Sequence, residues 1–198
     1  VLLRPRFGDF CYDEYEFQTL KEEVEQLRNL GADGVVIGIL KPDGSLNMEQ
    51  MADLVKAAGG IGITMHRAFD VCRDSFEALD QCISLGIDTI LTSGQKSSAW
   101  EGREMLAELV KRADGRLNIL AGAGIKPAVI EELAPCTGVS AFHMSGKKLI
   151  DSRMEFRRDG VPMGITGFSE FEVWQTSAES VSEAASVLRK LEARQTIC

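Results

Sequence analysis

A short strand pattern at residues 64–70, with the sequence TMHRAFD, ends in three ionisable side chains: His66, Arg67 and Asp70. An imidazole exchanges protons near neutral pH, a carboxylate accepts protons, and a guanidinium binds oxyanions. Such a group can bind an anionic small molecule and move a proton on it. We therefore take His66 and Asp70 as candidate catalytic residues and Arg67 as a candidate anion-binding residue.

A second apolar run, at residues 2–10, repeats this arrangement. Its sequence LLRPRFGDF places Arg4, Arg6 and Asp9 directly after the strand pattern. Two strands of one fold that both end in arginine and aspartate predict a shared pocket. Asp9 joins the candidate catalytic residues, and the two arginines join the anion-binding set. The plainer alternative is a layer of salt bridges between these arginines and the two aspartates.

Glycine and serine follow the later strand patterns and complete the candidate anion site. In barrel folds, the loops after the last two strands often hold phosphate with backbone N–H groups and a helix N-terminus. The sequence GAG before the helix pattern at residue 127 fits that role, although glycines also permit tight strand-to-helix packing. The full candidate anion-binding set is Arg4, Arg6, Arg67, Ser93, Gly94, Gly122, Gly124 and Ser145.

The chain has two histidines, and both stand at predicted strand ends. His66 and His143 are therefore candidate metal ligands as well as candidate bases, while a buried core histidine is equally expected for either one. Cys11 lies near the same edge, and a thiolate selects Cu(I) over harder ions. Met65 alternates with His66 and should face the helices. We expect the remaining helical cysteines to pack as small apolar groups: Cys72, Cys82 and Cys136.

The elements that must position these residues alternate regularly between strand and helix. Apolar spacing predicts strands at residues 1–4, 34–38, 63–66, 89–92, 117–121 and 139–143. It predicts helices at residues 15–30, 47–58, 75–85, 100–113, 127–133 and 178–194. Repeated βα units of this kind form either an open doubly wound sheet or a (β/α)8 barrel.

A TIM barrel is the better interpretation, because no GxGxxG motif follows the first strand and no P-loop is present. A complete barrel needs about 250 residues, so the predicted fold is an α/β TIM barrel with only six βα units in this chain. The sequence opens directly on a strand at Val1, which predicts that the chain starts within its fold. Residues 151–174 lack periodicity and are expected to form an active-site cover or an oligomer contact.

The composition predicts one soluble domain in a reducing compartment. The 198 residues are 44% hydrophobic, which suffices for one core. A net charge of −8 disfavours nucleic acid and anionic membranes as partners. No apolar stretch approaches the about 20 residues of a membrane span, and we find no secretion signal. The 5 cysteines, an odd number without a CxxC pair, favour the cytosol.

Several phrases of the sequence together resemble the CutC copper homeostasis family: RPRFGDF, GADGVVIGIL, TMHRAFD, ILTSG, AGAGI, FHMSG and DSRMEFR. The resemblance runs nearly end to end. It implies a TIM barrel, a homo-oligomer, a cytoplasmic location that includes the nucleus in animals, and copper tolerance through Cu(I) binding. It also implies that two further βα units precede the first strand present here, and that these units carry acidic and cysteine residues of the barrel mouth.

Two functional hypotheses follow. The leading one is a copper homeostasis protein that binds Cu(I) through thiolate, thioether or imidazole groups, with Cys11, His66 and His143 as candidate ligands. The alternative is a TIM-barrel enzyme or binding protein for a phosphorylated or carboxylated small molecule, whose anion is held by arginine side chains and a glycine loop. A third, structural alternative is a scaffold whose barrel mouth holds only ion pairs.

Overall fold

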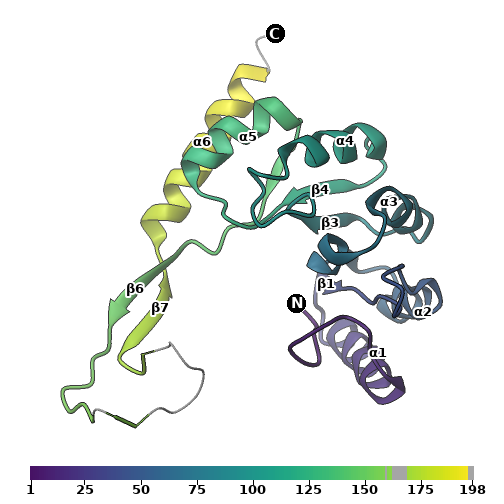
Figure 1. Cartoon of the computed structure of the whole chain (residues 1–198), viewed down its shortest axis with the longest axis horizontal. Coiled ribbons are helices and arrows are strands. Elements are labelled where there is room, and N and C mark those ends of the chain that lie inside the picture. The colour runs from purple at the N-terminus through teal and green to yellow at the C-terminus, as the bar shows by residue number, and fades with distance from the viewer. Residues whose placement is uncertain (159, 162–168, 196–198) are drawn as a thin grey trace.

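Helices and parallel strands alternate along most of the chain, as Figure 1 shows. The computed structural model describes residues 1–158, 160–161 and 169–195. The parallel strands are β1 (Gly34–Ile37), β2 (Gly62–Met65), β3 (Thr89–Thr92), β4 (Asn118–Ala121) and β5 (Ala141–Phe142). The helices are α1 (Glu14–Asn29), α2 (Met48–Ala58), α3 (Ser75–Ser84), α4 (Arg103–Ala113), α5 (Pro127–Thr137) and α6 (Ala178–Gln195). A short 3-10 helix, η1 (Arg67–Val71), follows β2.

The five strands form one parallel sheet in the order β1-β2-β3-β4-β5. The first predicted strand lies beside β1 as a single parallel bridge between Leu2 and Val36, and Leu3 donates its N–H to the carbonyl of Val36 at 3.0 Å. The predicted α/β fold with six βα units is therefore confirmed. Among the described residues, no strand pairing joins β5 back to the first segment, so the sheet is an open arc.

Alternate strand residues pack against the helices, which Figure 1 shows along one side of the sheet. In β1, Val35 and Ile37 are buried, whereas Gly34 and Val36 are partly exposed on the other side. The helices that cover this side have local signals at their ends. Asp13 and Glu16 form a capping box at the start of α1, and α2 ends at Gly59, whose φ of 59° is left-handed.

An antiparallel hairpin borders the segment at residues 151–174, which lacks periodicity in the sequence. Strands β6 (Lys147–Asp151) and β7 (Glu172–Thr176) pair in register from Lys147 with Thr176 to Asp151 with Glu172. These two strands were not among the predicted ones, because nine of the ten strand residues are exposed and no alternation of buried and exposed residues marks them. Residues 159 and 162–168 of the predicted segment lie outside the described residues. Figure 1 shows the hairpin projecting away from the sheet.

The last helix packs beside α5, with Ala184 buried against the core. Two helix ends differ from the prediction. α4 begins at Arg103 rather than at residue 100, because Gly102 and Ala99 belong to a loop tied by main-chain bonds to Ser98 and Ala123. α5 runs past residue 133 and contains Pro135. In the described part of the chain, no helix is both long and apolar enough to span a membrane.

Candidate functional site

The carboxylate of Asp70 is the most heavily hydrogen-bonded group at the carboxyl edge of the sheet. Thr92 donates its hydroxyl to Oδ1 at 2.5 Å, the N–H of Ser93 donates to the same oxygen at 2.9 Å, and the N–H of Gln95 does so at 3.2 Å. Arg67 Nε donates to Oδ2 at 2.6 Å. These donors come from η1, from the last residue of β3 and from the loop after β3, so Asp70 joins two neighbouring strand ends.

Arg67 extends this network toward solvent. Its Nη2 donates to Ser93 Oγ at 2.9 Å, and its side chain is 44% exposed, whereas that of Asp70 is 5% exposed. The arrangement brings together the predicted residues Arg67, Asp70 and Ser93. The network matches the alternative of a salt-bridge layer, because the lone pairs of Asp70 already accept hydrogen bonds from groups of this protein.

Arg6 and Asp9 form a second ion-paired group on the loop that precedes α1. Arg6 Nη2 donates to Asp9 Oδ1 at 2.9 Å, and Arg6 Nε donates to Glu16 Oε1 at 2.6 Å. The hydrogen bond that Arg6 donates to Asp9 raises the pKa of Arg6 and lowers the pKa of Asp9. Glu16 was not singled out from the sequence; its place three residues after Asp13 signalled only a helix cap.

Arg4 has a different environment. It donates from Nη2 to the carbonyl of Gly8 at 2.6 Å, and its guanidinium carbon lies 4.6 Å from the ring centroid of Phe10. The Phe10 ring in turn lies 4.9 Å from the imidazole of His66, tilted by 48°. Arg4, Phe10 and His66 therefore form a stack that joins the first loop to the end of β2. Phe10 has no ionisable group, and no sequence motif indicated a role for it.

His66 is buried, with 4% of its surface exposed. Its Nδ1 accepts the main-chain N–H of Ala68 at 3.1 Å, which also caps the start of η1. Burial lowers the pKa of this imidazole to about 4, so the ring is neutral at pH 7. Nε2 has no hydrogen-bond partner among the described residues. Gly38 allows the close approach of the ring, since a Cβ there would come within 2.6 Å of His66 Cε1.

The three candidate metal ligands lie in different environments. Cys11 is half-buried and lines a pocket of about 380 Å³ together with Phe10, Leu40 and Lys41. His66 is buried behind Phe10, and His143 is exposed after β5. Among the described residues, no group of three or more histidine, cysteine, aspartate or glutamate side chains is arranged to hold a metal ion.

Two of the three helical cysteines pack in the core as expected. Burial raises the pKa of the Cys72 thiol to about 11 and that of the Cys82 thiol to about 12. Cys136 was expected to pack in the same way, but it is exposed near the end of α5. The prediction failed there because α5 continues to Thr137, which turns Cys136 onto its outer side.

The predicted glycine and serine residues follow the ends of strands, and the glycines there allow left-handed backbone angles and close packing. Gly94 has a φ of 69°, and a side chain there would overlap the carbonyl of Gly102. Ala123 and Gly124 both have a φ of 73°, in the loop between β4 and α5. Ser145 lies beyond β5 and lines a pocket of about 310 Å³, whose other walls include Lys126, Pro127, Met144, Lys147 and Trp174. No side chain caps the start of α5 beside this pocket.

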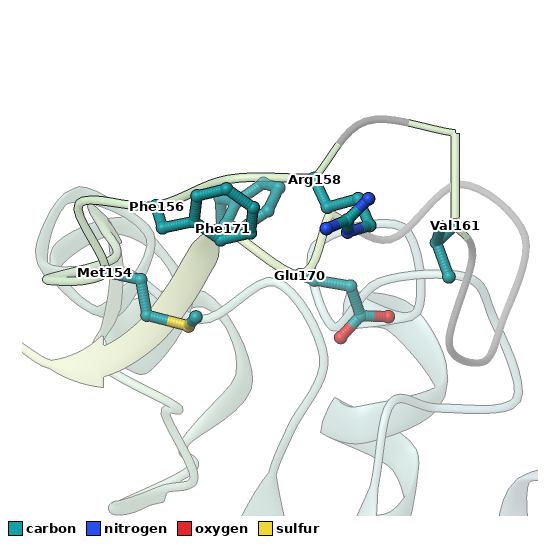
Figure 2. Close-up of a pocket in the computed structure, with 6 residues that line it drawn as sticks. All are labelled: Met154, Phe156, Arg158, Val161, Glu170 and Phe171. Atoms are coloured by element: carbon teal, nitrogen blue, oxygen red, sulfur yellow. The ribbon is translucent and has the colours of Figure 1, made fainter.

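The hairpin carries a third pocket, of about 350 Å³, which Figure 2 shows. Its walls are mainly apolar and belong to the connection between β6 and β7. Phe156 is 66% exposed, Met154 is 58% exposed and Val161 is 51% exposed. Arg158 and Glu170 supply its charged groups. This pocket lies away from the strand ends that carry the predicted site.

A family model and the sequence relatives of this chain name the same family. The model of the CutC family matches residues 1–148. A protein named CutC from Parabacteroides distasonis is 47% identical over 182 residues, which cover 91% of this chain and 75% of that protein. A CutC protein from Chromobacterium violaceum is 41% identical over 190 residues, which cover 96% of this chain and 77% of that protein.

Solved structures agree with these matches. The crystal structure of CutC from Streptococcus agalactiae, a protein named for copper homeostasis, aligns with a TM-score of 0.69 at 29% identity and covers 72% of this chain and 70% of that one. A structure named native KDPGal aligns with a TM-score of 0.53 at 15% identity, covers 86% of this chain and 65% of that one, and supports the fold alone. On the family match and these relatives, the chain belongs to the CutC family.

Proposed function

We propose that this protein serves copper homeostasis by binding Cu(I) in the cytosol. The support is its membership of the CutC family and its likeness to the Streptococcus agalactiae protein named for that role. In this proposal the ion is cargo that the protein takes up and passes on. A thiol is the side chain best suited to Cu(I), because soft ligands favour this ion.

The half-buried thiol of Cys11 is the observation that carries this proposal. It lines an open pocket at the edge of the candidate site. The other cysteines in the described residues fit less well, since Cys72 and Cys82 are buried with raised pKa values and Cys136 lies on an outer helix surface. The thiolate is the metal-binding form, so a raised pKa disfavours binding.

His66 does not fit as a ligand in this arrangement. Its Nδ1 lone pair accepts the N–H of Ala68, which leaves the ring proton on Nε2. With no group of three suitable side chains among the described residues, the donor set fits a sparsely coordinated ion rather than a closed metal site. Sparse coordination suits cargo, because few bonds must break on transfer.

X-ray absorption spectroscopy at the copper edge tests the role of sulfur in this proposal. The protein loaded with Cu(I) under reducing conditions is expected to show sulfur in the first coordination shell, and Cys11→Ser should remove that scattering. Cys136→Ser is the matched control, because it removes an exposed thiol outside the pocket. A shell of nitrogen and oxygen alone would contradict the assignment.

We further propose that the protein is a homo-oligomer and that the hairpin of β6 and β7 lies in the interface. An isolated two-stranded hairpin is marginal in water, yet Trp174 is 50% exposed and Val173 is 45% exposed. Analytical ultracentrifugation tests this. Trp174→Gln should lower the assembled fraction, whereas Trp100→Gln, at a 39% exposed tryptophan on another surface, should not. A purely monomeric protein at high concentration would contradict the proposal.

A second candidate function is the binding of a phosphorylated small molecule. The specific observation is the 310 Å³ pocket at the start of α5, which Lys126, Ser145 and Lys147 line. Pro127 at the start of α5 has no N–H, and without a side-chain cap the N–H groups that follow it in the first turn remain available to an anion. Isothermal titration with inorganic phosphate should give binding that Lys126→Gln weakens, while Lys111→Gln, on α4, has no effect. Equal binding by both variants would overturn this candidate.

A further inference from the structure

The imidazole of His66 is a buried donor without an acceptor. Only 4% of the residue is exposed, and Nε2 has no partner among the described residues. Because Nδ1 accepts the N–H of Ala68 at 3.1 Å, the single proton of the neutral ring sits on Nε2. Buried polar groups are nearly always hydrogen-bonded, so this orphaned N–H requires an explanation.

The imidazole of His66 carries no positive charge at pH 7. Desolvation lowers its pKa to about 4, and the charge of Arg4 acts in the same direction. Arg4 and His66 also contact the same Phe10 ring, whose centroid lies 4.6 Å from the guanidinium carbon and 4.9 Å from the imidazole centroid. A ligand that meets both groups would therefore meet one positive charge and one neutral N–H donor.

Phe10 covers this imidazole and also lines the neighbouring pocket. Its ring centroid lies 4.9 Å from that of His66, and the same side chain forms part of the wall of the 380 Å³ pocket. The ring is only partly buried and sits on a loop in which Gly8 has a φ of 100°. Phe10 is therefore the side chain that the buried imidazole and the pocket share.

Arg4 differs from the other arginines of the candidate site because no described carboxylate lies within ion-pair distance of it. Arg6 is paired with Asp9 and Glu16, and Arg67 is paired with Asp70. Arg4 makes one hydrogen bond, to the carbonyl of Gly8, and rests on the Phe10 ring. Its remaining N–H groups are available to an anion.

We propose that the protein binds the carboxylate of a small molecule between Arg4 and His66, with the Phe10 ring displaced from above the imidazole. One carboxylate oxygen accepts the Nε2–H of His66, and the guanidinium of Arg4 binds the carboxylate and balances its charge. One positive charge and one neutral donor match a carboxylate, with its charge of −1, better than they match a phosphate dianion. The site adjoins Cys11 but does not need its thiol, so the inference stands apart from copper binding.

Nuclear magnetic resonance of protein labelled with 15N-histidine tests this directly, because the chain has only 2 histidines. Titration with pyruvate and with acetate is expected to shift the Nε2 signal of His66 saturably. The exposed His143 is the internal reference and should not shift. If neither carboxylate moves the His66 signal at concentrations up to tens of millimolar, the inference is wrong. An equal response to inorganic phosphate would overturn the assigned ligand class.

Variants separate the roles of the two groups. Arg4→Gln is expected to weaken carboxylate binding at least tenfold. Arg103→Gln is the matched control, since Arg103 also rests on an aromatic ring, that of Trp100, and donates to one backbone carbonyl. His66→Phe should abolish binding, whereas His66→Gln, which keeps an N–H donor, should retain part of it. Unchanged affinity in Arg4→Gln would contradict the proposal.

Discussion

Thr92 donates its hydroxyl to Oδ1 of Asp70 at 2.5 Å and so joins the end of β3 to the 3-10 helix that follows β2. Asp70 accepts further hydrogen bonds from Arg67, Ser93 and Gln95. Several groups that are distant in sequence thus depend on one buried carboxylate. Its removal would leave several donors of this edge without their partner.

Asp70→Ala is therefore expected to lower the free energy of unfolding by about 3 kcal/mol, the cost of leaving buried donors and a charge unpaired. Asp80→Ala is the matched control, because Asp80 and its partner Arg112 are 46% and 47% exposed. Loss of that exposed pair should cost less than about 1 kcal/mol. Chemical denaturation of both variants measures the difference, and equal losses would show that the Asp70 network adds no stability.

The buried imidazole of His66 predicts a stability change with pH. Its pKa is lowered from 6.5 to about 4 in the folded protein. As the pH falls from 6.5 to 4, the unfolded chain gains a proton that the folded protein does not, so the free energy of unfolding should fall by about 3 kcal/mol. His66→Gln should remove this slope, and His143→Gln should keep it. Denaturation across this pH window gives the answer; a parallel slope in His66→Gln would assign it elsewhere.

The cysteines should react at different rates. The raised pKa values of Cys72 and Cys82 and their burial keep these thiols protonated and covered at pH 8. Cys11 and Cys136 should therefore be alkylated first, and the two buried thiols only after unfolding. Peptide mass spectrometry with a timed alkylation reads the order, and early labelling of Cys82 would contradict the packing of α3.

Two glycines with nearly the same backbone angle should differ in their tolerance of a side chain. Gly94 has a φ of 69° and faces the carbonyl of Gly102, whereas Gly115 has a φ of 70° and faces open space. Gly115→Ala should cost about 1 kcal/mol from backbone strain alone. Gly94→Ala adds a backbone clash and should cost about 3 kcal/mol or more. Similar melting temperatures for the two variants would argue against close packing of the β3 loop on α4.

The sequence predicted the alternation of strands and helices because its signals are local. Thr89–Thr92 is bounded by a glycine turn on one side and polar residues on the other, and the structure has a strand with the same bounds. The hairpin was missed because nearly all residues of β6 and β7 are exposed, so neither strand carries a buried stripe. Periodicity detects burial rather than strands as such.

The candidate site was predictable in its residue types but not in its pairings. His66, Arg67 and Asp70 follow β2 as their sequence suggests. Thr92 and Gln95 lie 22 and 25 residues after Asp70 and donate hydrogen bonds to its carboxylate. From the sequence alone, this carboxylate was a candidate for proton transfer. The burial of His66 beneath Phe10 likewise depends on a contact across 56 residues of sequence, between two loops whose approach no local pattern encodes.

The measurement that tests the central claim most directly is a Cu(I) competition titration against a chromophoric chelator under reducing conditions. We expect the protein to withdraw one Cu(I) per chain, Cys11→Ser to lose this uptake and Cys136→Ser to keep it. No uptake by the unaltered protein, or uptake that survives Cys11→Ser, would contradict the proposal that this protein carries Cu(I) through the thiol of Cys11.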